Sequence, residues 1–170
     1  MRAYLAITII ADDRPGIVEK VADKIKTNGG NWLESNMSRL AGKFAGILLV
    51  SVAPENQTQL TDALKSLQED AVQVVVEQTG TAAETDSGTS HTLDIVANDR
   101  PGIIAELSSL FARHSINVEE LSTWCESAPM SADLLFRARA VVTTPADIST
   151  DKMAEIIESL SDDLVVEFES

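Results

Sequence analysis

The sequence contains few of the residues that build covalent, metal-bound or membrane-spanning structures. It has a single cysteine, Cys125, so no disulfide can form within the chain, and this cysteine usage is typical of a reducing compartment. No apolar run approaches the roughly 20 residues that a membrane-spanning helix needs. Met1–Tyr4 leads directly into a strand pattern rather than into the layout of a signal peptide. We therefore expect a cytoplasmic protein that has no membrane contact.

Residue patterns typical of catalysis or cofactor binding are also missing. His91, His114 and Cys125 are scattered, and their spacing predicts neither a zinc site nor a pair of nucleophile and base. The glycines form no phosphate-binding or dinucleotide-binding fingerprint. We interpret Cys125 as a structural residue. The sequence therefore predicts a protein that is not an enzyme, with no catalytic residue, no metal and no cofactor.

Positive charge is scarce, and it is distributed unevenly. Lys and Arg number 13 against 27 Asp and Glu, which gives a net charge of −14. Residues 1–80 hold 8 basic and 10 acidic side chains, whereas residues 81–170 hold 5 and 17. Such a surface repels a phosphate backbone, and no stripe of Lys and Arg is present to overcome the repulsion. These charges argue against direct binding to nucleic acid, and we interpret the acidity as a contribution to solubility.

One pentapeptide occurs twice, and the chain is organised around it. Asp13–Ile17 has the sequence Asp-Arg-Pro-Gly-Ile, which returns 86 residues later at Asp99–Ile103. The same offset relates flanking residues to one another: Ile7 to Leu93, Ile9 to Ile95, Ala11 to Ala97 and Asn31 to Asn117. Because the pentapeptide is in register with the strand before it and an asparagine after it, the chain is a tandem duplication.

The repeated pentapeptide has the properties of a strand-to-helix connection. A proline is well tolerated at the first helical position, so we expect the helices to begin at Pro15 and Pro101. Gly16 and Gly102 present backbone without a Cβ, and the N–H groups that start a helix have no intrahelical partner. Such a helix start favours a carboxylate or another small anion. A structural corner without a ligand is the alternative interpretation.

Hydrophobic periodicity predicts the order βαββαβ in each half. This order is typical of an α+β, ferredoxin-like unit, in which a four-stranded antiparallel sheet carries two helices on one face. We predict a first domain at residues 1–79, a linker at 80–90 and a second domain at 91–170. Each half has a modest core, so we expect the halves to pack on each other or on a second copy of the chain. The predicted strands cover 3–10, 32–40, 44–52, 72–77, 91–97, 117–124, 132–142 and 164–168, and the predicted helices cover 15–28, 56–69, 101–114 and 150–161.

A βαββαβ unit that opens with a strand, an Asp-Arg-Pro-Gly loop and a helix resembles the ACT domain, a module that commonly binds amino acids and regulates enzymes or transcription factors. The tandem arrangement resembles the glycine cleavage system transcriptional repressor family. The resemblance covers nearly the whole chain, and its sharpest motifs are the two Asp-Arg-Pro-Gly loops and the asparagines Asn31 and Asn117.

This resemblance implies an amino-acid site between the loop and first helix of one unit and the facing surface of a neighbouring unit. Helix-start amides suit the carboxylate of a zwitterion, and the oxygen of an Asp or Asn suits its ammonium group. Asp12 of the first repeat is Asn98 in the second, so the two sites need not bind alike. The implied ligand-binding residues are Asp13, Arg14, Gly16, Ile17, Val18 and Asn31 in the first repeat, and Asp99, Arg100, Gly102, Ile103, Ile104 and Asn117 in the second.

Three hypotheses for function stay open at this point. In the first, the protein is a transcriptional co-repressor of the glycine cleavage system. It senses an amino acid, with glycine as the expected ligand, and acts through a LysR-type DNA-binding partner. In the second, it is a free-standing allosteric subunit that transmits amino-acid levels to a metabolic enzyme. In the third, the ligand site has decayed and only protein–protein assembly, including homo-oligomer formation, remains.

Overall fold

The computed structural model describes residues 1–80, 88–129 and 133–169. It divides the chain into two compact units, Met1–Ala83 and Glu84–Ser170. Most of the predicted linker, and part of the connection between the last two long strands, lie outside the described residues. The predicted domain boundaries stay a prediction.

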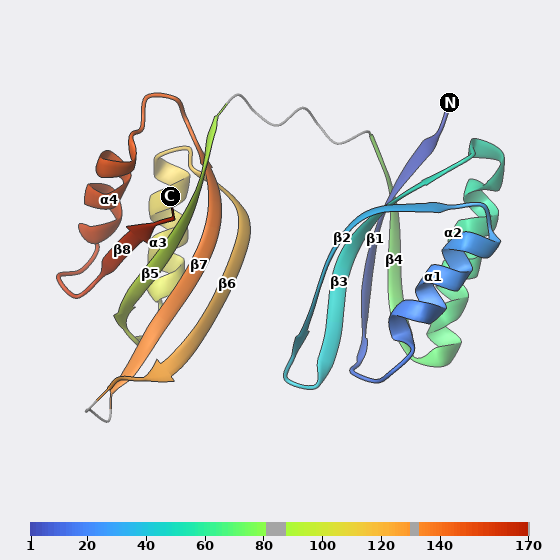
Figure 1. Cartoon of the computed structure of the whole chain (residues 1–170), viewed down its shortest axis with the longest axis horizontal. Helices are drawn as coiled ribbons and strands as arrows, with labels where there is room; N and C mark the ends of the chain where they lie inside the picture. Colours follow the sequence, from blue (N-terminus) through green and yellow to red (C-terminus); the bar gives the residue numbers. More distant parts are fainter. Residues whose placement is uncertain (81–87, 130–132, 170) are drawn as a thin grey trace. The chain divides into compact units, whose positions relative to one another are not determined.

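The first unit is a four-stranded antiparallel sheet with its helices on one face (Figure 1). The strands lie side by side in the order β2-β3-β1-β4, so the first strand is central. Short 3₁₀ turns, Pro54–Asn56 and Ser66–Asp70, flank the second helix. The elements in chain order are β1 (Ala3–Asp12), α1 (Ile17–Thr27), β2 (Asn31–Leu40), β3 (Lys43–Val52), α2 (Gln57–Lys65) and β4 (Val72–Thr79).

The core of the first unit lies between the sheet and the two helices. Alternate residues of β1 point to this side, as the period of two predicts, and Ile7 is fully buried there. On α1, three residues spaced four apart are buried against these strand residues: Ile17, Val21 and Ile25. The core also includes Leu5, Ile9, Leu48, Val50, Leu60, Leu64, Leu67, Val72 and Val74.

The second unit repeats this architecture with the strand order β6-β7-β5-β8. Its last strand has only four residues, against eight in β4. Both units therefore have the predicted βαββαβ order and the α+β fold, which confirms the fold prediction. The elements are β5 (Thr89–Asn98), α3 (Ile103–Arg113), β6 (Asn117–Ser127), β7 (Leu134–Thr144), α4 (Thr150–Glu158) and β8 (Val165–Phe168).

Two predictions about the first helix of each unit are wrong. The helices begin at Ile17 and Ile103 rather than at the prolines, because the glycine between proline and helix has left-handed dihedral angles that no right-handed helix contains. The apolar residues Ile17, Val18, Val21, Ala22 and Ile25 also predict one buried stripe on α1, but Val18 is 46% exposed. It follows the buried Ile17 at a rotation of 100°, which carries it off the buried stripe.

Candidate functional site

The connection between β1 and α1 has an unusual backbone at its last residue. Gly16 lies at φ 90° and ψ −1°, and its carbonyl accepts the N–H of Lys20 at 3.0 Å, which makes it the N-cap of α1. A Cβ at Gly16 would meet no atom within 4 Å, so the glycine is required by its dihedral angles rather than by lack of space. No described side chain caps this helix start. Its first N–H groups therefore suit an external anion.

A small hollow of about 220 Å³ opens beside this connection. Five of the six ligand-binding residues predicted for the first repeat line it, so the structure brings them together. Glu19 and Phe44 complete the lining, and neither was predicted. The five are Asp13, Arg14, Gly16, Ile17 and Val18.

Asn31, the sixth predicted residue, lies elsewhere. It pairs with Ser51 of β3, which in turn pairs with Tyr4 near the start of β1, whereas the loop follows the end of β1. At about 3.3 Å per strand residue, Asn31 and Asp13 lie about 30 Å apart along the sheet. Asn117 is equally far from the second loop. It pairs with Thr143, which pairs with Ser90 near the start of β5, whereas the loop follows the end of β5. A single amino acid is much shorter than this separation, so it cannot contact both the loop and the asparagine of the same unit.

Two cations of the first loop region share one acidic residue. Arg14 donates to the backbone carbonyl of Asp70, and the Lys20 ammonium lies 2.9 Å from the Asp70 carboxylate. The hydrogen bond from Lys20 lowers the pKa of Asp70 below its ordinary value. On the other side of the loop, Asp13 contacts Arg39 at 3.4 Å. The surroundings of the first loop thus offer both a cationic and an anionic group to a ligand.

The second loop has the same backbone and different charges. Gly102 lies at φ 88° and caps α3 through its carbonyl, as Gly16 caps α1. Arg100, however, is held by both oxygens of Glu106, at 2.7 and 2.6 Å. This hydrogen-bonded pair raises the pKa of Arg100 and lowers that of Glu106. Because Lys20 stands at the place of Glu106 in the first repeat, only the first loop keeps two cations.

The other predicted residues of the second repeat surround the same loop. The Asp99 N–H donates to the carbonyl of Leu134 at 2.9 Å, while Ile103 is buried and Ile104 packs at the edge of the core. Cys125 of β6 is exposed, and it lies beside Asp99. Partial desolvation, followed by the charge of Asp99, raises the pKa of the Cys125 thiol. A raised pKa disfavours the reactive thiolate.

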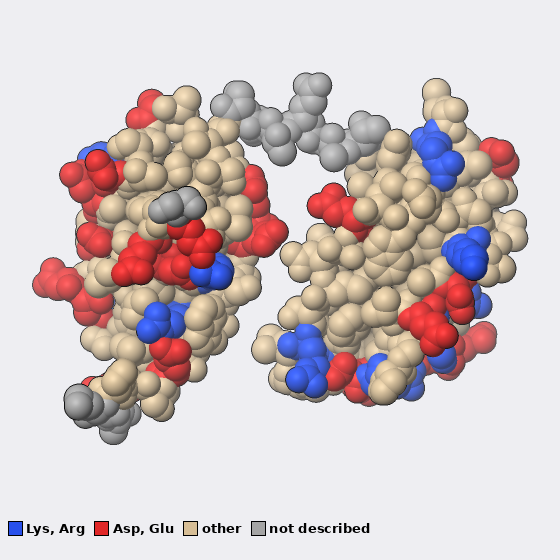
Figure 2. Space-filling view, viewed as in Figure 1, with Lys and Arg blue, Asp and Glu red and all other residues tan. Residues whose placement is uncertain are grey.

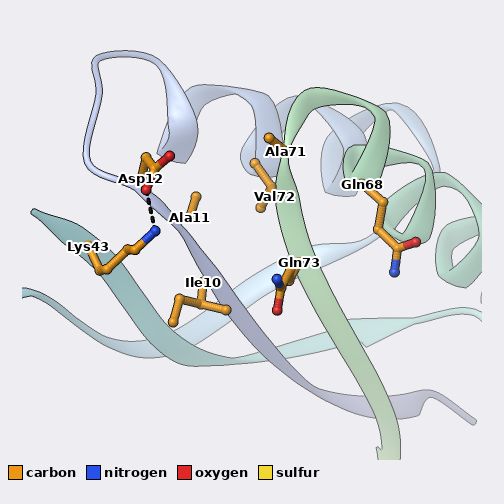
Figure 3. A pocket seen from close by; sticks show the side chains of 8 residues that line it. All are labelled: Ile10, Ala11, Asp12, Lys43, Gln68, Ala71, Val72 and Gln73. Carbon is orange, nitrogen blue, oxygen red and sulfur yellow. Dashed lines mark hydrogen bonds and ion pairs between the residues drawn. The ribbon is translucent and has the colours of Figure 1, made fainter.

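A larger hollow of about 700 Å³ lies next to the first loop (Figure 3). Lys43 and Asp12 form an ion pair at one end of it, and Gln68 and Gln73 add two amides. The hydrogen bond from Lys43 lowers the pKa of Asp12. Sequence reasoning missed Lys43, Gln68 and Gln73, because they come from separate segments and stand outside the repeated motif. An ammonium, a carboxylate and two amides around one hollow suit a small polar molecule.

In the second repeat, a carboxylate stands at the position that corresponds to Ala71, a residue that lines this hollow in the first repeat. Asp163 precedes the buried Leu164 as Ala71 precedes the buried Val72. Its carboxylate accepts the N–H of Asn98 at 2.8 Å and the hydroxyl of Ser161. The hydrogen bond from Ser161, then that from Asn98, lowers the pKa of Asp163. The Asp163 side chain therefore occupies the space in the second repeat that Ala71 leaves open in the first.

Within the ranges that the structure describes, no helix is long and apolar enough to cross a membrane. In the same ranges, no three His, Cys, Asp or Glu side chains gather closely enough to hold a metal ion.

Comparison with known proteins places both units in one family. Residues 3–77 and residues 91–162 each match the ACT domain. The glycine cleavage system transcriptional repressor of Escherichia coli (strain K12) is 24% identical over 163 residues, which cover 95% of this chain and 85% of the relative. The UPF0237 protein MK1213 of Methanopyrus kandleri is 32% identical over 73 residues, which cover 43% of this chain and 76% of that protein.

Solved structures share the fold over nearly the whole chain. A crystal structure described only as an unknown protein from Galdieria sulphuraria has a TM-score of 0.84 at 23% identity, and covers 99% of this chain and 98% of its own. A second crystal structure, provisionally assigned as a glycine cleavage system transcriptional repressor, has a TM-score of 0.74 at 19% identity, with 99% and 97% covered. At these identities the likeness establishes the tandem fold.

Proposed function

Because this chain belongs to the ACT-domain family, as a tandem pair of ACT domains, we propose that it is an amino-acid-responsive regulator rather than an enzyme. The observation that carries the proposal is the uncapped helix start at Gly16. Five predicted residues surround a hollow there that is large enough for a small amino acid. A regulator needs a ligand site and a protein partner, and it needs no catalytic group.

The first loop supplies a partner for each end of a zwitterion. The N–H groups of Ile17 and Val18 face a ligand carboxylate, and Arg14, whose guanidinium donates to a backbone carbonyl, balances its charge. The Asp13 carboxylate accepts the ammonium group. Glycine is the ligand we propose, because the Escherichia coli relative is named a repressor of the glycine cleavage system and the hollow of about 220 Å³ has room for it. We place the principal site in the first unit, because Glu106 already neutralises Arg100 in the second.

The relation to the Escherichia coli repressor supports a role as a transcriptional co-repressor of the glycine cleavage system. A net charge of −14 disfavours direct contact with DNA, so the protein acts through a DNA-binding partner, which we propose to be a LysR-type regulator. Acidic side chains predominate over the second unit in the view of Figure 2, and they suit a partner with basic residues.

The ligand part of this proposal is tested by thermal unfolding against a panel of amino acids that includes glycine and serine. A ligand that binds only the folded protein adds about 2.7 kcal/mol at 100 times its dissociation constant. For a unit of this size, such a gain raises the Tm by at least several degrees. If no amino acid shifts the transition, the ligand site is refuted.

The partner part is tested by co-purification with a LysR-type regulator of the glycine cleavage genes, with and without glycine. We expect complex formation to change with glycine, and gel shifts to show DNA retention only when the regulator is present. Binding of this protein to operator DNA alone would contradict the proposal. Glycine-dependent capture of a metabolic enzyme in place of the regulator would instead favour the allosteric-subunit hypothesis.

A further inference from the structure

The backbone N–H of Asp12, the last residue of β1, faces the hollow of about 700 Å³. Successive N–H groups along a strand point to opposite neighbours. The N–H of Asp13 donates to the carbonyl of Gly42, beside β3, at 2.9 Å, so that of Asp12 points toward β4. The ladder between β1 and β4 ends one pair earlier, at Ala11 and Val72. Among the residues that the structure describes, none accepts a hydrogen bond from this N–H, which leaves it available to a ligand.

In the second unit, a carboxylate satisfies the equivalent N–H. Asn98 takes the place of Asp12 at the end of its strand, and its N–H donates to an Asp163 oxygen at 2.8 Å. Hydrogen bonds to an ionised group are roughly twice as strong as neutral ones. Asp163 takes the place of Ala71, whose side chain has no acceptor. We call the space between Asp12 and Ala71 the β4 corner; one copy of the fold fills it with its own carboxylate, and the other leaves it open.

The β4 corner also offers positive charge. Arg14 donates to the backbone carbonyl of Asp70, next to the corner, so its hydrogen-bond partner is neutral. The carboxylates of Asp12 and Asp70 are each paired with a lysine, and these pairs leave the charge of Arg14 for a ligand. In the second unit, the hydrogen bonds described above, and then the charge of Arg100, lower the pKa of Asp163. An arginine at this position therefore stabilises a carboxylate in the corner.

The other walls of the hollow suit an organic molecule rather than a bare ion (Figure 3). A volume of about 700 Å³ lies within the range of about 300–1,000 Å³ that is typical of small-molecule sites. Ile10 gives the wall an apolar part, and the amides of Gln68 and Gln73 both donate and accept hydrogen bonds. A carboxylate in the β4 corner thus leaves room for a short carbon skeleton beside Ile10 and for a polar group at the amides.

We propose that the β4 corner binds the carboxylate of a small organic acid, in the position that the Asp163 carboxylate takes in the second unit. The N–H of Asp12 donates to one carboxylate oxygen, and the charge of Arg14 stabilises the anion. The organic part of the ligand extends along Ile10 toward the two glutamines. This hollow shares no lining residue with the hollow at the first loop, so the site is independent of the glycine site.

Amide NMR of the whole chain tests this site with acetate as the probe. Sodium acetate is titrated at constant pH, with sodium chloride holding the ionic strength constant, and acetamide serves as the matched uncharged molecule. We expect acetate to move the Asp12 amide proton downfield in a saturable way, and acetamide to bind at least tenfold more weakly, because it lacks the charge. An Asp12 amide that acetate leaves in place overturns the proposal. So does a response confined to Ile17 and Val18, which would place acetate at the helix start of α1.

Two substitutions at Ala71 form a matched pair. Ala71 lies at φ 59°, and both aspartate and glycine adopt left-handed dihedral angles more readily than alanine. Ala71→Asp copies the second unit and supplies the carboxylate from the chain itself, whereas Ala71→Gly leaves the β4 corner open. We expect acetate to bind at least tenfold more weakly to Ala71→Asp and with unchanged affinity to Ala71→Gly. Equal affinity in the two variants would contradict a carboxylate site at this corner.

The reverse substitution opens the same space in the second unit. Asp163→Ala removes the acceptor of the Asn98 N–H, and dispersed amide signals of the second unit check that the variant folds. We expect acetate to move the Asn98 amide proton in this variant and to leave it in place in the wild type. An Asn98 amide that does not respond in the folded variant would overturn the comparison between the two units. None of these measurements uses glycine, so an absence of glycine binding would refute the loop site and leave the β4 corner intact.

Discussion

Replacement of Gly16 by alanine tests the backbone on which the candidate site depends. Left-handed dihedral angles cost a residue with a Cβ about 1–2 kcal/mol. A Cβ at Gly16 would meet no atom within 4 Å, so the substitution adds no steric clash. Alanine also lowers the conformational entropy of the unfolded chain, which offsets this cost by about 0.4–1 kcal/mol of stability. We therefore expect Gly16→Ala to destabilise the first unit by about 1 kcal/mol.

Gly80→Ala is the matched control, because Gly80 also has no neighbour within 4 Å and lacks a positive φ. We expect no loss of stability from this substitution. Urea unfolding and calorimetry of the whole chain measure both variants, and about 1 kcal/mol corresponds to a Tm decrease of roughly 4–8 °C in a unit of this size. Equal stabilities of the Gly16→Ala variant and the wild type would refute the argument that the loop needs glycine for its dihedral angles.

Two further predictions concern stability alone. Leu64 of α2 is fully buried, so Leu64→Ala should destabilise the first unit by about 2–5 kcal/mol, as urea unfolding would measure, and leave the second transition in place. The pKa of Asp163 is lowered in the folded state, so the ionised carboxylate stabilises the fold. This stabilisation is complete above the ordinary carboxyl pKa of about 4, which applies to the unfolded chain. It disappears as the pH falls through the lower pKa of the folded state. Asp163→Asn should therefore lower stability at pH 7 and flatten the acid dependence of unfolding below about pH 4. An unchanged acid profile would contradict the roles given to the hydrogen bonds from Ser161 and Asn98.

The fold was predictable from the sequence because its determinants are local and occur twice. Period-two alternation through Leu5, Ile7 and Ile9 specifies a half-buried strand, and the stripe on α1 specifies the face that covers it. The start of α1 was predicted two residues early. Both a helical proline and a left-handed glycine are compatible with Pro15–Gly16, and the sequence alone does not distinguish them.

The candidate site was predictable only where its residues are neighbours in sequence. Asp13–Val18 surround one hollow because they form one turn and the start of one helix. The position of Asn31 depends on the direction and register of β2, which place it at the end of the sheet opposite that loop. Lys43, Gln68 and Gln73 line the same hollow only because of tertiary packing, and no motif connects them. The charges of the two loops differ through Lys20 and Glu106, a substitution that is visible in the sequence once the repeat is aligned.

Calorimetric titration of glycine into the wild type and into Val18→Glu tests the central claim, which is ligand binding at the first loop. Val18 lines the hollow and is 46% exposed, so glutamate is accommodated there, and an acidic side chain in the first turn suits a helix start. Its carboxylate would lie where the ligand carboxylate is proposed to bind. The account predicts saturable binding of glycine to the wild type and at least tenfold weaker binding to Val18→Glu, with thermal stability retained. Equal affinity in the two proteins would contradict a ligand site at this loop.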